Sequence, residues 1–189
     1  MAETLFPADV AAQAAAVLAQ CRSKGWRIAT VESCTGGLIS AALTEIPGSS
    51  DVLAGSLVTY ANSAKMGLVG VSAETLKRVG AVSAETADEM ARGALRALPE
   101  IALSLSVTGV AGPGGGSVEK PVGLVYMATA LRGRLGASDQ VTVERNVFCT
   151  DLPRPKAISM DGPDALRTAI RLATLRRGLA LLMQAAKMH

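Results

Sequence analysis

Apolar residues along the chain follow two kinds of pattern, which alternate from one end to the other. Short runs rich in β-branched residues are typical of buried strands, and longer Ala- and Leu-rich stretches bounded by Pro or Gly are typical of helices. The short runs predict strands at 26–31, 52–60, 101–107, 122–130 and 141–148. The longer stretches predict helices at 8–24, 38–46 and 164–187. Helices before, between and after strands predict an α/β domain with three layers, α/β/α, and a mixed sheet.

A pentapeptide that occurs twice in nearly the same form predicts two further helix starts. Val71-Ser-Ala-Glu-Thr75 and Val82-Ser-Ala-Glu-Thr86 each place a Ser at an N-cap and a Glu in the first turn, where the helix dipole favours it. The preceding segment 61–67 predicts a turn or a single helical turn. The segment 151–161, which is rich in proline, predicts a loop before the last helix.

Length and composition indicate one globular domain spanning residues 1–189. Hydrophobic residues make up 49% of the chain and charged residues 19%, which excludes disorder as the main state. Aromatic residues are only 3%, too few for a platform that stacks single-stranded nucleic acid. The net charge of +3 is also too small to indicate nucleic-acid binding. The basic residues late in the chain predict a solvated helix face and its preceding loop: Arg154, Lys156, Arg167, Arg171, Arg176, Arg177 and Lys187.

Histidine and cysteine usage narrows the possible chemistry. The one histidine is His189, the last residue, which argues against a Ser-His-Asp triad, a Cys-His dyad or a His-based zinc site. Three cysteines without a CxxC pair do not indicate a disulfide framework or a Cys-rich metal site. We therefore expect no metal site built from histidine or cysteine. The chain has no apolar run of about 18 residues and no basic start, so a cytoplasmic protein without a membrane segment is expected.

The turn between the first strand and the second helix contains the first candidate for chemistry. Glu32-Ser33-Cys34-Thr35-Gly36-Gly37 would place a hydroxyl where helix N–H groups can stabilise an oxyanion. Alternatively, Ser33 only caps the helix and the glycines only form the turn. Cys34 is the rival nucleophile, or a small buried residue as free cysteines usually are.

Lys65 is the second candidate, because a serine nucleophile without histidine needs another base. A desolvated lysine is the known substitute, and its pKa must fall towards neutrality. The alternative is an ordinary surface lysine.

The glycine-rich segment 108–117 is the third candidate, since consecutive glycines allow backbone N–H groups to approach a phosphate closely. Its spacing does not fit a P-loop, and a flexible surface turn is the alternative. Arg145 either pairs with a phosphate or is an exposed strand residue. A hydroxyl, a lysine and an anion-binding loop together suggest hydrolysis or acyl transfer on a small phosphorylated substrate.

Several of these segments also resemble a known family. The blocks that carry the resemblance are Glu32-Ser-Cys-Thr-Gly-Gly37, Gly55-Ser-Leu-Val-Thr-Tyr-Ala-Asn-Ser-Ala-Lys65, Gly80-Ala-Val-Ser83, Thr108-Gly-Val-Ala-Gly-Pro113, Gly115-Gly-Ser117 and Lys120-Pro-Val-Gly123. In this order they closely resemble the CinA carboxy-terminal domain family, also known as nicotinamide-nucleotide amidohydrolases. The resemblance covers nearly the whole chain.

The resemblance implies a three-layer α/β/α fold and deamidation of nicotinamide mononucleotide to nicotinate mononucleotide and ammonia, with no metal or cofactor. Ser33 would be the nucleophile, Lys65 the base and Tyr60 a residue that orients Lys65. The N–H groups of Thr35, Gly36 and Gly37 would hold the oxyanion. The nucleotide would contact Thr108, Gly109, Gly115, Gly116, Ser117 and Arg145.

The chain departs from the usual family pattern. Family members often carry an amino-terminal domain that resembles molybdopterin-binding proteins, which is absent from these 189 residues. Segment 149–160 is expected to be an insertion, and Gly162-Pro163-Asp164 lacks the family's arginine. The alternative is a nucleotide-binding module without turnover, in competence or recombination. The Ala- and Leu-rich composition suits a homodimer.

Overall fold

A computed structural model describes residues 5–133, 137–148 and 163–188. Its sheet has the strand order β2-β1-β3-β4-β5. The strands are β1 (Ile28–Glu32), β2 (Leu53–Val58), β3 (Leu103–Gly109), β4 (Leu124–Leu131) and β5 (Gln140–Val147). β1 runs parallel to β2 and β3, whereas β4 runs antiparallel to β3 and β5. The mixed sheet is therefore confirmed.

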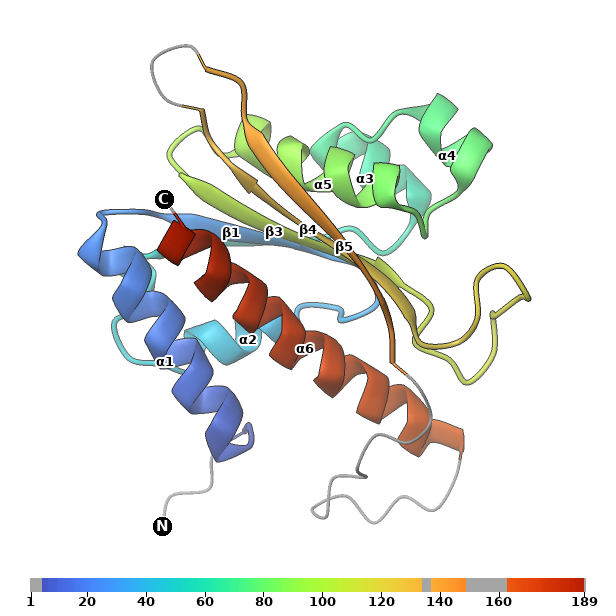
Figure 1. Ribbon diagram of the computed structural model, residues 1–189, viewed down its shortest axis with the longest axis horizontal. Coiled ribbons are helices and arrows are strands. Elements are labelled where there is room, and N and C mark those ends of the chain that lie inside the picture. The colour runs from blue at the N-terminus through green and yellow to red at the C-terminus, as the bar shows by residue number, and fades with distance from the viewer. Residues whose placement is uncertain (1–4, 134–136, 149–162, 189) are drawn as a thin grey trace.

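Helices cover both faces of the sheet and complete the expected three layers. One face packs against α1 (Ala8–Ser23), α2 (Leu38–Thr44) and α6 (Pro163–Met188). The other carries α3 (Asn62–Val69), α4 (Ala73–Val79) and α5 (Ala84–Ala97). Figure 1 shows the sheet between these two groups of helices. A short 3-10 helix, η1 (Ser49–Asp51), precedes β2. No helix within the described ranges is long and apolar enough to span a membrane.

The hydrophobic core lies in two layers, one on each face of the sheet. All five residues of β1 are buried, and they alternate between the layers. Ile28 belongs to the cluster beneath α1, α2 and α6, whereas Ala29 and Val31 belong to the cluster beneath α5. A central strand with parallel neighbours is covered on both faces, so even its polar residues Thr30 and Glu32 are buried.

Helix α3 is longer than the sequence indicated, and it packs closely against α5. A turn or a single helical turn was expected at 61–67, but α3 has eight residues and its Ala61 N-cap makes no side-chain hydrogen bond. The sequence therefore carried no capping signal for this helix. Gly93 of α5 faces its last residue, because a Cβ at Gly93 would lie 2.0 Å from the carbonyl oxygen of Val69. This contact requires glycine.

The two repeated pentapeptides behave as expected. Ser72 Oγ accepts a hydrogen bond from the Thr75 amide at 2.9 Å, and Ser83 Oγ accepts one from the Thr86 amide at 3.1 Å. Each serine is the N-cap of its helix, α4 and α5 respectively. Both predicted helix starts are confirmed.

The solvated basic face expected near the end of the chain is found only in part, because the arginines of α6 are half-buried and bonded to other elements. Arg176 forms an ion pair with Asp9 of α1, with Nε 2.6 Å from Oδ2, and Arg177 pairs with Glu144 of β5. Arg167 and Arg171 point towards the turn after β1 and the glycine-rich segment instead. Lys187 is exposed as expected. The other expectations for this region lie outside the described residues: Arg154, Lys156, the insertion 149–160 and the loop 151–161.

Candidate active site

Ser33 lies in the turn directly after β1. Its amide donates to the carbonyl of Val107 on the neighbouring strand β3 at 3.0 Å, and its carbonyl accepts from the Gly36 amide at 3.1 Å. The chain then passes through Gly36 and Gly37, whose φ angles of +61° and +92° favour glycine. These contacts place the Ser33 side chain at the carboxyl edge of the parallel strands.

Glu32, the last residue of β1, occupies the backbone donors at the start of α2. Its carboxylate accepts hydrogen bonds from the amides of Gly37, Ile39 and Ser40, at 3.0, 3.1 and 2.9 Å. The side chain is completely buried. The amides of Gly36 and Gly37, both expected as oxyanion donors, therefore already have acceptors within the protein.

Lys65 lies on α3, the helix that follows the neighbouring strand β2, and its side chain reaches Ser33. Its Nζ lies 2.9 Å from Ser33 Oγ and donates to the carbonyl oxygens of Thr59, at 2.6 Å, and Tyr60, at 3.3 Å. Lys65 is only 1% exposed and Ser33 8%. The two residues meet because β1 and β2 are parallel neighbours, so the segments that follow them emerge at the same edge of the sheet.

Burial shifts the pKa values of the two groups that flank the Ser33 hydroxyl. Desolvation lowers the pKa of Lys65, because the charged amine is disfavoured away from water. Desolvation also raises the pKa of the Cys34 thiol to about 11. Near neutral pH the thiol is therefore protonated and a poor nucleophile. Because Lys65 Nζ is hydrogen-bonded to Ser33 Oγ, the geometry favours Ser33 over Cys34 as the attacking group.

A cavity of about 210 Å³ opens at Ser33 and Lys65. Its walls come from five parts of the chain: the turn after β1, the segment after β2 that continues into α3, the turn between α4 and α5, the end of β3 and the start of α6. The lining residues are Ser33, Cys34, Tyr60, Lys65, Ala81, Val82, Thr108, Gly109, Ala111 and Arg167.

The structure brings five of the expected site residues together around this cavity: Ser33, Lys65, Tyr60, Thr108 and Gly109. Thr108 is buried and its hydroxyl donates to the carbonyl of Ala81 at 2.7 Å. A Cβ at Gly109 would lie 2.7 Å from the carbonyl of Leu124, so close strand packing accounts for that glycine. Tyr60 is 64% exposed at the edge of the cavity.

Seven other expected site residues do not line the cavity: Thr35, Gly36, Gly37, Gly115, Gly116, Ser117 and Arg145. The glycine-rich segment closes on itself. The Ser117 amide donates to the Lys120 carbonyl, the Lys120 amide donates to Ser117 Oγ, and a Cβ at Gly116 would meet Val122 at 2.9 Å. Arg145 is exposed on β5, in register with Tyr126.

Two arginines of α6 reach the site, and the sequence reasoning missed both. Arg167 Nη1 donates to the carbonyl of Gly112 at 2.8 Å, and its Nη2 donates to the Tyr60 hydroxyl at 3.3 Å. Arg171 Nη2 donates to the carbonyl of Thr35 at 2.8 Å. Their spacing of four residues, which places them on one helix face, was the available signal.

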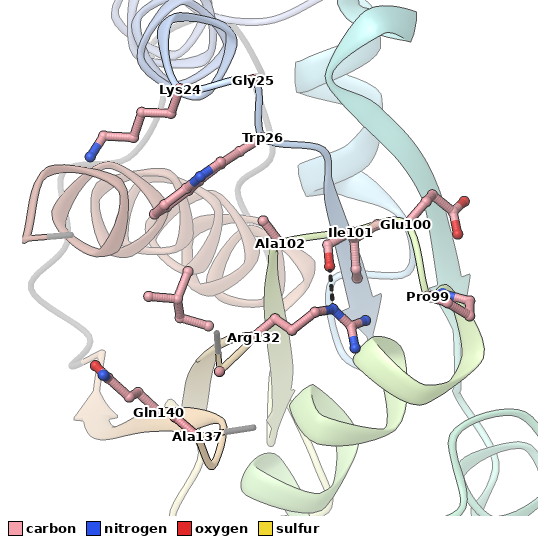
Figure 2. A pocket seen from close by; sticks show the side chains of 12 residues that line it. Lys24, Gly25, Trp26, Pro99, Glu100, Ile101, Ala102, Arg132, Ala137 and Gln140 are labelled. Atoms are coloured by element: carbon pink, nitrogen blue, oxygen red, sulfur yellow. Dashed lines mark hydrogen bonds between the residues drawn. The ribbon is translucent and has the colours of Figure 1, made fainter. Parts of the chain in front are cut away.

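A larger cavity, of about 630 Å³, lies at the opposite end of the sheet (Figure 2). Its polar groups make structural contacts. Arg132 Nε donates to the carbonyl of Ile101 at 2.9 Å and its Nη2 to that of Leu95 at 2.6 Å, while Lys24 Nζ lies 4.9 Å from the centre of the Trp26 ring. This arrangement contains no serine paired with a base.

No metal site accompanies these cavities in the part of the chain that the structure describes. Histidine, cysteine, aspartate and glutamate side chains do not gather there in a group of three that could hold an ion.

Comparison with known proteins identifies the family of this chain. The sequence model of the CinA C-terminal domain matches residues 10–150. This chain belongs to the CinA C-terminal domain family. Among curated relatives, a putative competence-damage inducible protein of Acetivibrio thermocellus is 58% identical over 103 residues, which are 54% of this chain and 25% of that protein. A CinA-like protein of a Synechococcus strain is 52% identical over 128 residues, 68% of this chain and 30% of the relative. The chain thus spans about a quarter to a third of the length of such relatives.

Solved structures of the CinA superfamily share the fold over nearly their whole length. The competence/damage inducible protein CihA from Agrobacterium tumefaciens matches with a TM-score of 0.82 and 43% identity, covering 96% of this chain and 98% of that one. A CinA superfamily protein from Escherichia coli matches with a TM-score of 0.75 and 29% identity, covering 97% and 95%. These likenesses establish the CinA fold for this chain.

Proposed function

We propose that this CinA-family chain is an amidohydrolase that converts nicotinamide mononucleotide to nicotinate mononucleotide and ammonia. The observation that carries the proposal is the distance of 2.9 Å between Lys65 Nζ and Ser33 Oγ, both buried at one cavity. A lysine whose pKa is lowered by burial is a suitable base for a serine hydroxyl. A module that only binds nucleotides has no need for this pair.

In the proposed acylation step, Lys65 Nζ accepts the Ser33 proton while Oγ attacks the carboxamide carbon. The resulting tetrahedral intermediate collapses when protonated Lys65 donates that proton to the amide nitrogen, which leaves as ammonia. Ser33 then carries the acyl group as an ester. The neighbouring carbonyls of Thr59 and Tyr60 hold Nζ in place throughout.

In the proposed deacylation step, Lys65 takes a proton from water, which attacks the ester carbon. The second tetrahedral intermediate collapses as protonated Lys65 returns this proton to Ser33 Oγ. The carboxylic acid that is released passes the remaining proton of the water molecule to ammonia or to solvent and becomes the nicotinate carboxylate.

The oxyanion of both intermediates needs backbone donors near Ser33. The Gly36 and Gly37 amides already have acceptors, and Thr35 does not line the cavity. We therefore assign this role to the amide of Cys34, the residue after the nucleophile. Cys34 lines the cavity, and no oxygen of the described residues accepts from its amide.

The dimensions and charge of the cavity suit one end of a mononucleotide. Binding sites for whole small ligands are typically about 300–1,000 Å³. The volume of about 210 Å³ therefore suits the pyridine carboxamide, with ribose and phosphate towards the opening. Arg167 lines the cavity and, among the described residues, donates only to neutral oxygens of Gly112 and Tyr60. A phosphate would give Arg167 a charge-assisted partner, so the proposal assigns the phosphate to Arg167 rather than to the expected Arg145.

Ammonia release from nicotinamide mononucleotide tests this function directly, with Ser33→Ala and Lys65→Ala measured beside the wild type. Turnover by the wild type and its loss in both folded variants are expected. The matched control is Cys34→Ala, which should retain turnover. A folded wild type that binds the mononucleotide without releasing ammonia would overturn the proposal in favour of a nucleotide-binding module.

A further inference from the structure

Glu32 is a completely buried carboxylate that the proposed proton transfers do not use. Its Oε2 accepts from the Gly37 and Ile39 amides, and its Oε1 accepts from the Ser40 amide and, at 3.1 Å, from the Thr30 hydroxyl. No described Lys or Arg forms an ion pair with it. A buried carboxylate is costly unless hydrogen bonds satisfy it, and here four donors do so.

These contacts provide the capping that α2 lacks from its own residues. The N-cap of α2 is Gly37, which has no side chain to accept the first amides of the helix. The Glu32 carboxylate, at the end of β1, accepts hydrogen bonds from these amides instead. The turn 33–37 is thereby held at both ends by one residue, since its first residue is bonded to Glu32 and its last donates to the Glu32 side chain.

The main chain of Glu32 also connects to the residues that hold Lys65. The carbonyl of Glu32 accepts from the Thr59 amide at 2.8 Å, and the carbonyl of Thr59 in turn accepts from Lys65 Nζ at 2.6 Å. The side chain of Glu32 is also linked to β2, because Thr30, which donates to the Glu32 carboxylate, has its Oγ1 2.8 Å from Ser56 Oγ, its partner in register. Glu32 therefore contacts both segments whose alignment sets the distance between Ser33 and Lys65.

We propose that Glu32 is a positioning residue that keeps Ser33 Oγ within hydrogen-bond reach of Lys65 Nζ. This inference rests on the proposed function, because it assigns Glu32 to the same nucleophile and base. Glu32 acts through the turn and through Thr59, without touching the substrate.

The Glu32→Gln variant tests the role with little change in shape. The Gln oxygen can replace Oε2 towards Gly37 and Ile39, and its NH₂ group can donate to the Thr30 hydroxyl. The same NH₂ group must then face the Ser40 amide, donor against donor, which displaces the turn. We expect kcat to fall by about 10- to 100-fold, because a misplacement of about 1 Å costs on the order of 100-fold. KM should be unchanged, since the cavity residues remain.

Two further variants separate positioning from stability. Thr30→Val removes one donor to Glu32 and leaves the helix amides, so the same loss of kcat should appear on a smaller scale. Ile101→Val removes a methyl group from the core beneath α5, far from the turn, and should lower the melting temperature without changing kcat. For each variant, the loss of kcat is compared with the decrease in melting temperature. If Ile101→Val loses as much kcat per degree of lowered melting temperature as Glu32→Gln does, Glu32 only stabilises the fold and the inference is overturned.

The rate at which a fluorophosphonate labels Ser33 gives a readout that does not depend on the substrate. Labelling of the wild type, its absence in Lys65→Ala and its slowing in Glu32→Gln are expected. Wild-type labelling without ammonia release would remove the mononucleotide as substrate and leave the role of Glu32 standing. Equal labelling of wild type and Glu32→Gln would refute that role alone. If the wild type is not labelled, Ser33 is not an activated nucleophile, and both proposals are overturned.

Discussion

The two ends of the sheet each carry a cavity, and the smaller one holds the groups suited to catalysis. At the larger cavity, of about 630 Å³, the Arg132 guanidinium is bonded to backbone carbonyls and the indole of Trp26 is covered by Lys24. At the smaller one, of about 210 Å³, a buried lysine with a lowered pKa faces a serine. A buried base with a lowered pKa beside a hydroxyl is therefore a better guide to function than cavity volume.

Strand direction explains why the ends differ. β1, β2 and β3 are parallel, so the turns after all three reach the edge that carries Ser33, Lys65 and Gly109. At the other edge, β1 and β3 begin and β4 ends, and the residues there mainly fasten these segments to α5. In α/β sheets with parallel strands, ligands commonly bind at the carboxyl edge.

Replacing the buried basic residue of each cavity by methionine should give the largest difference in activity between the two ends of the sheet. Lys65→Met should lower kcat by about 100- to 10,000-fold, the usual contribution of a general base. Arg132→Met should leave kcat/KM unchanged, but it should lower the free energy of unfolding by about 1–3 kcal/mol, because buried carbonyls lose their donor. Ammonia release and denaturant unfolding measure the two effects. A loss of turnover in Arg132→Met would give the larger cavity a role in the reaction.

Removal of the Arg167 charge should weaken substrate binding. Arg167→Met is expected to raise KM by about 10- to 100-fold, because a hydrogen bond to a charged group contributes about 1.5–3 kcal/mol. Nicotinamide riboside, which lacks the phosphate, should be affected much less. Arg176→Met on the same helix is the control, since Arg176 pairs with Asp9 at the surface. Equal effects on mononucleotide and riboside would contradict the phosphate contact.

The pH dependence of kcat/KM should show the pKa of Lys65. The protonated amine cannot accept the Ser33 proton, so activity should fall about tenfold per pH unit below this pKa. Because burial lowers the pKa of Lys65, the inflection should lie below the ordinary lysine value of 10.5. Cys34→Ala should keep the same profile. A profile that loses its inflection in that variant would assign the titration to the thiol.

The smallest effect is expected for the rival nucleophile itself. Cys34→Ala should change kcat/KM by less than about threefold, which is under 1 kcal/mol of barrier height. Burial keeps the Cys34 thiol protonated near neutral pH, with a pKa of about 11. Ammonia release measured before and after treatment with a thiol reagent provides the same comparison in the wild type. Complete inactivation in both experiments would favour Cys34 over Ser33.

Local signals explain which parts could be predicted from the sequence. The N-cap serines Ser72 and Ser83 accept hydrogen bonds from amides only three residues further along the chain, so their pattern is visible in the sequence. The turn that presents Ser33 was likewise visible as glycines between a strand and a helix. Helix α3 was underestimated because Ala61 provides no capping side chain.

Contacts with distant backbone atoms explain what the sequence reasoning missed. Arg167 donates to the carbonyl of Gly112, 55 residues away, and Glu32 accepts from main-chain amides. Backbone partners leave no pattern of residue types that could reveal them. The distance between Ser33 and Lys65 also depends on the parallel alignment of β1 and β2, which residue spacing does not determine.

The close contact between Gly93 and Val69 affects how natural variants of this chain should be interpreted. Lys65 lies one helical turn before Val69 on α3, and only a glycine at position 93 lets α5 approach that helix so closely. Even the addition of a single methyl group at position 93 would push against the helix that carries the lysine. A survey that ranks substitutions by distance from the nucleophile would therefore classify a damaging change on a distant helix as harmless.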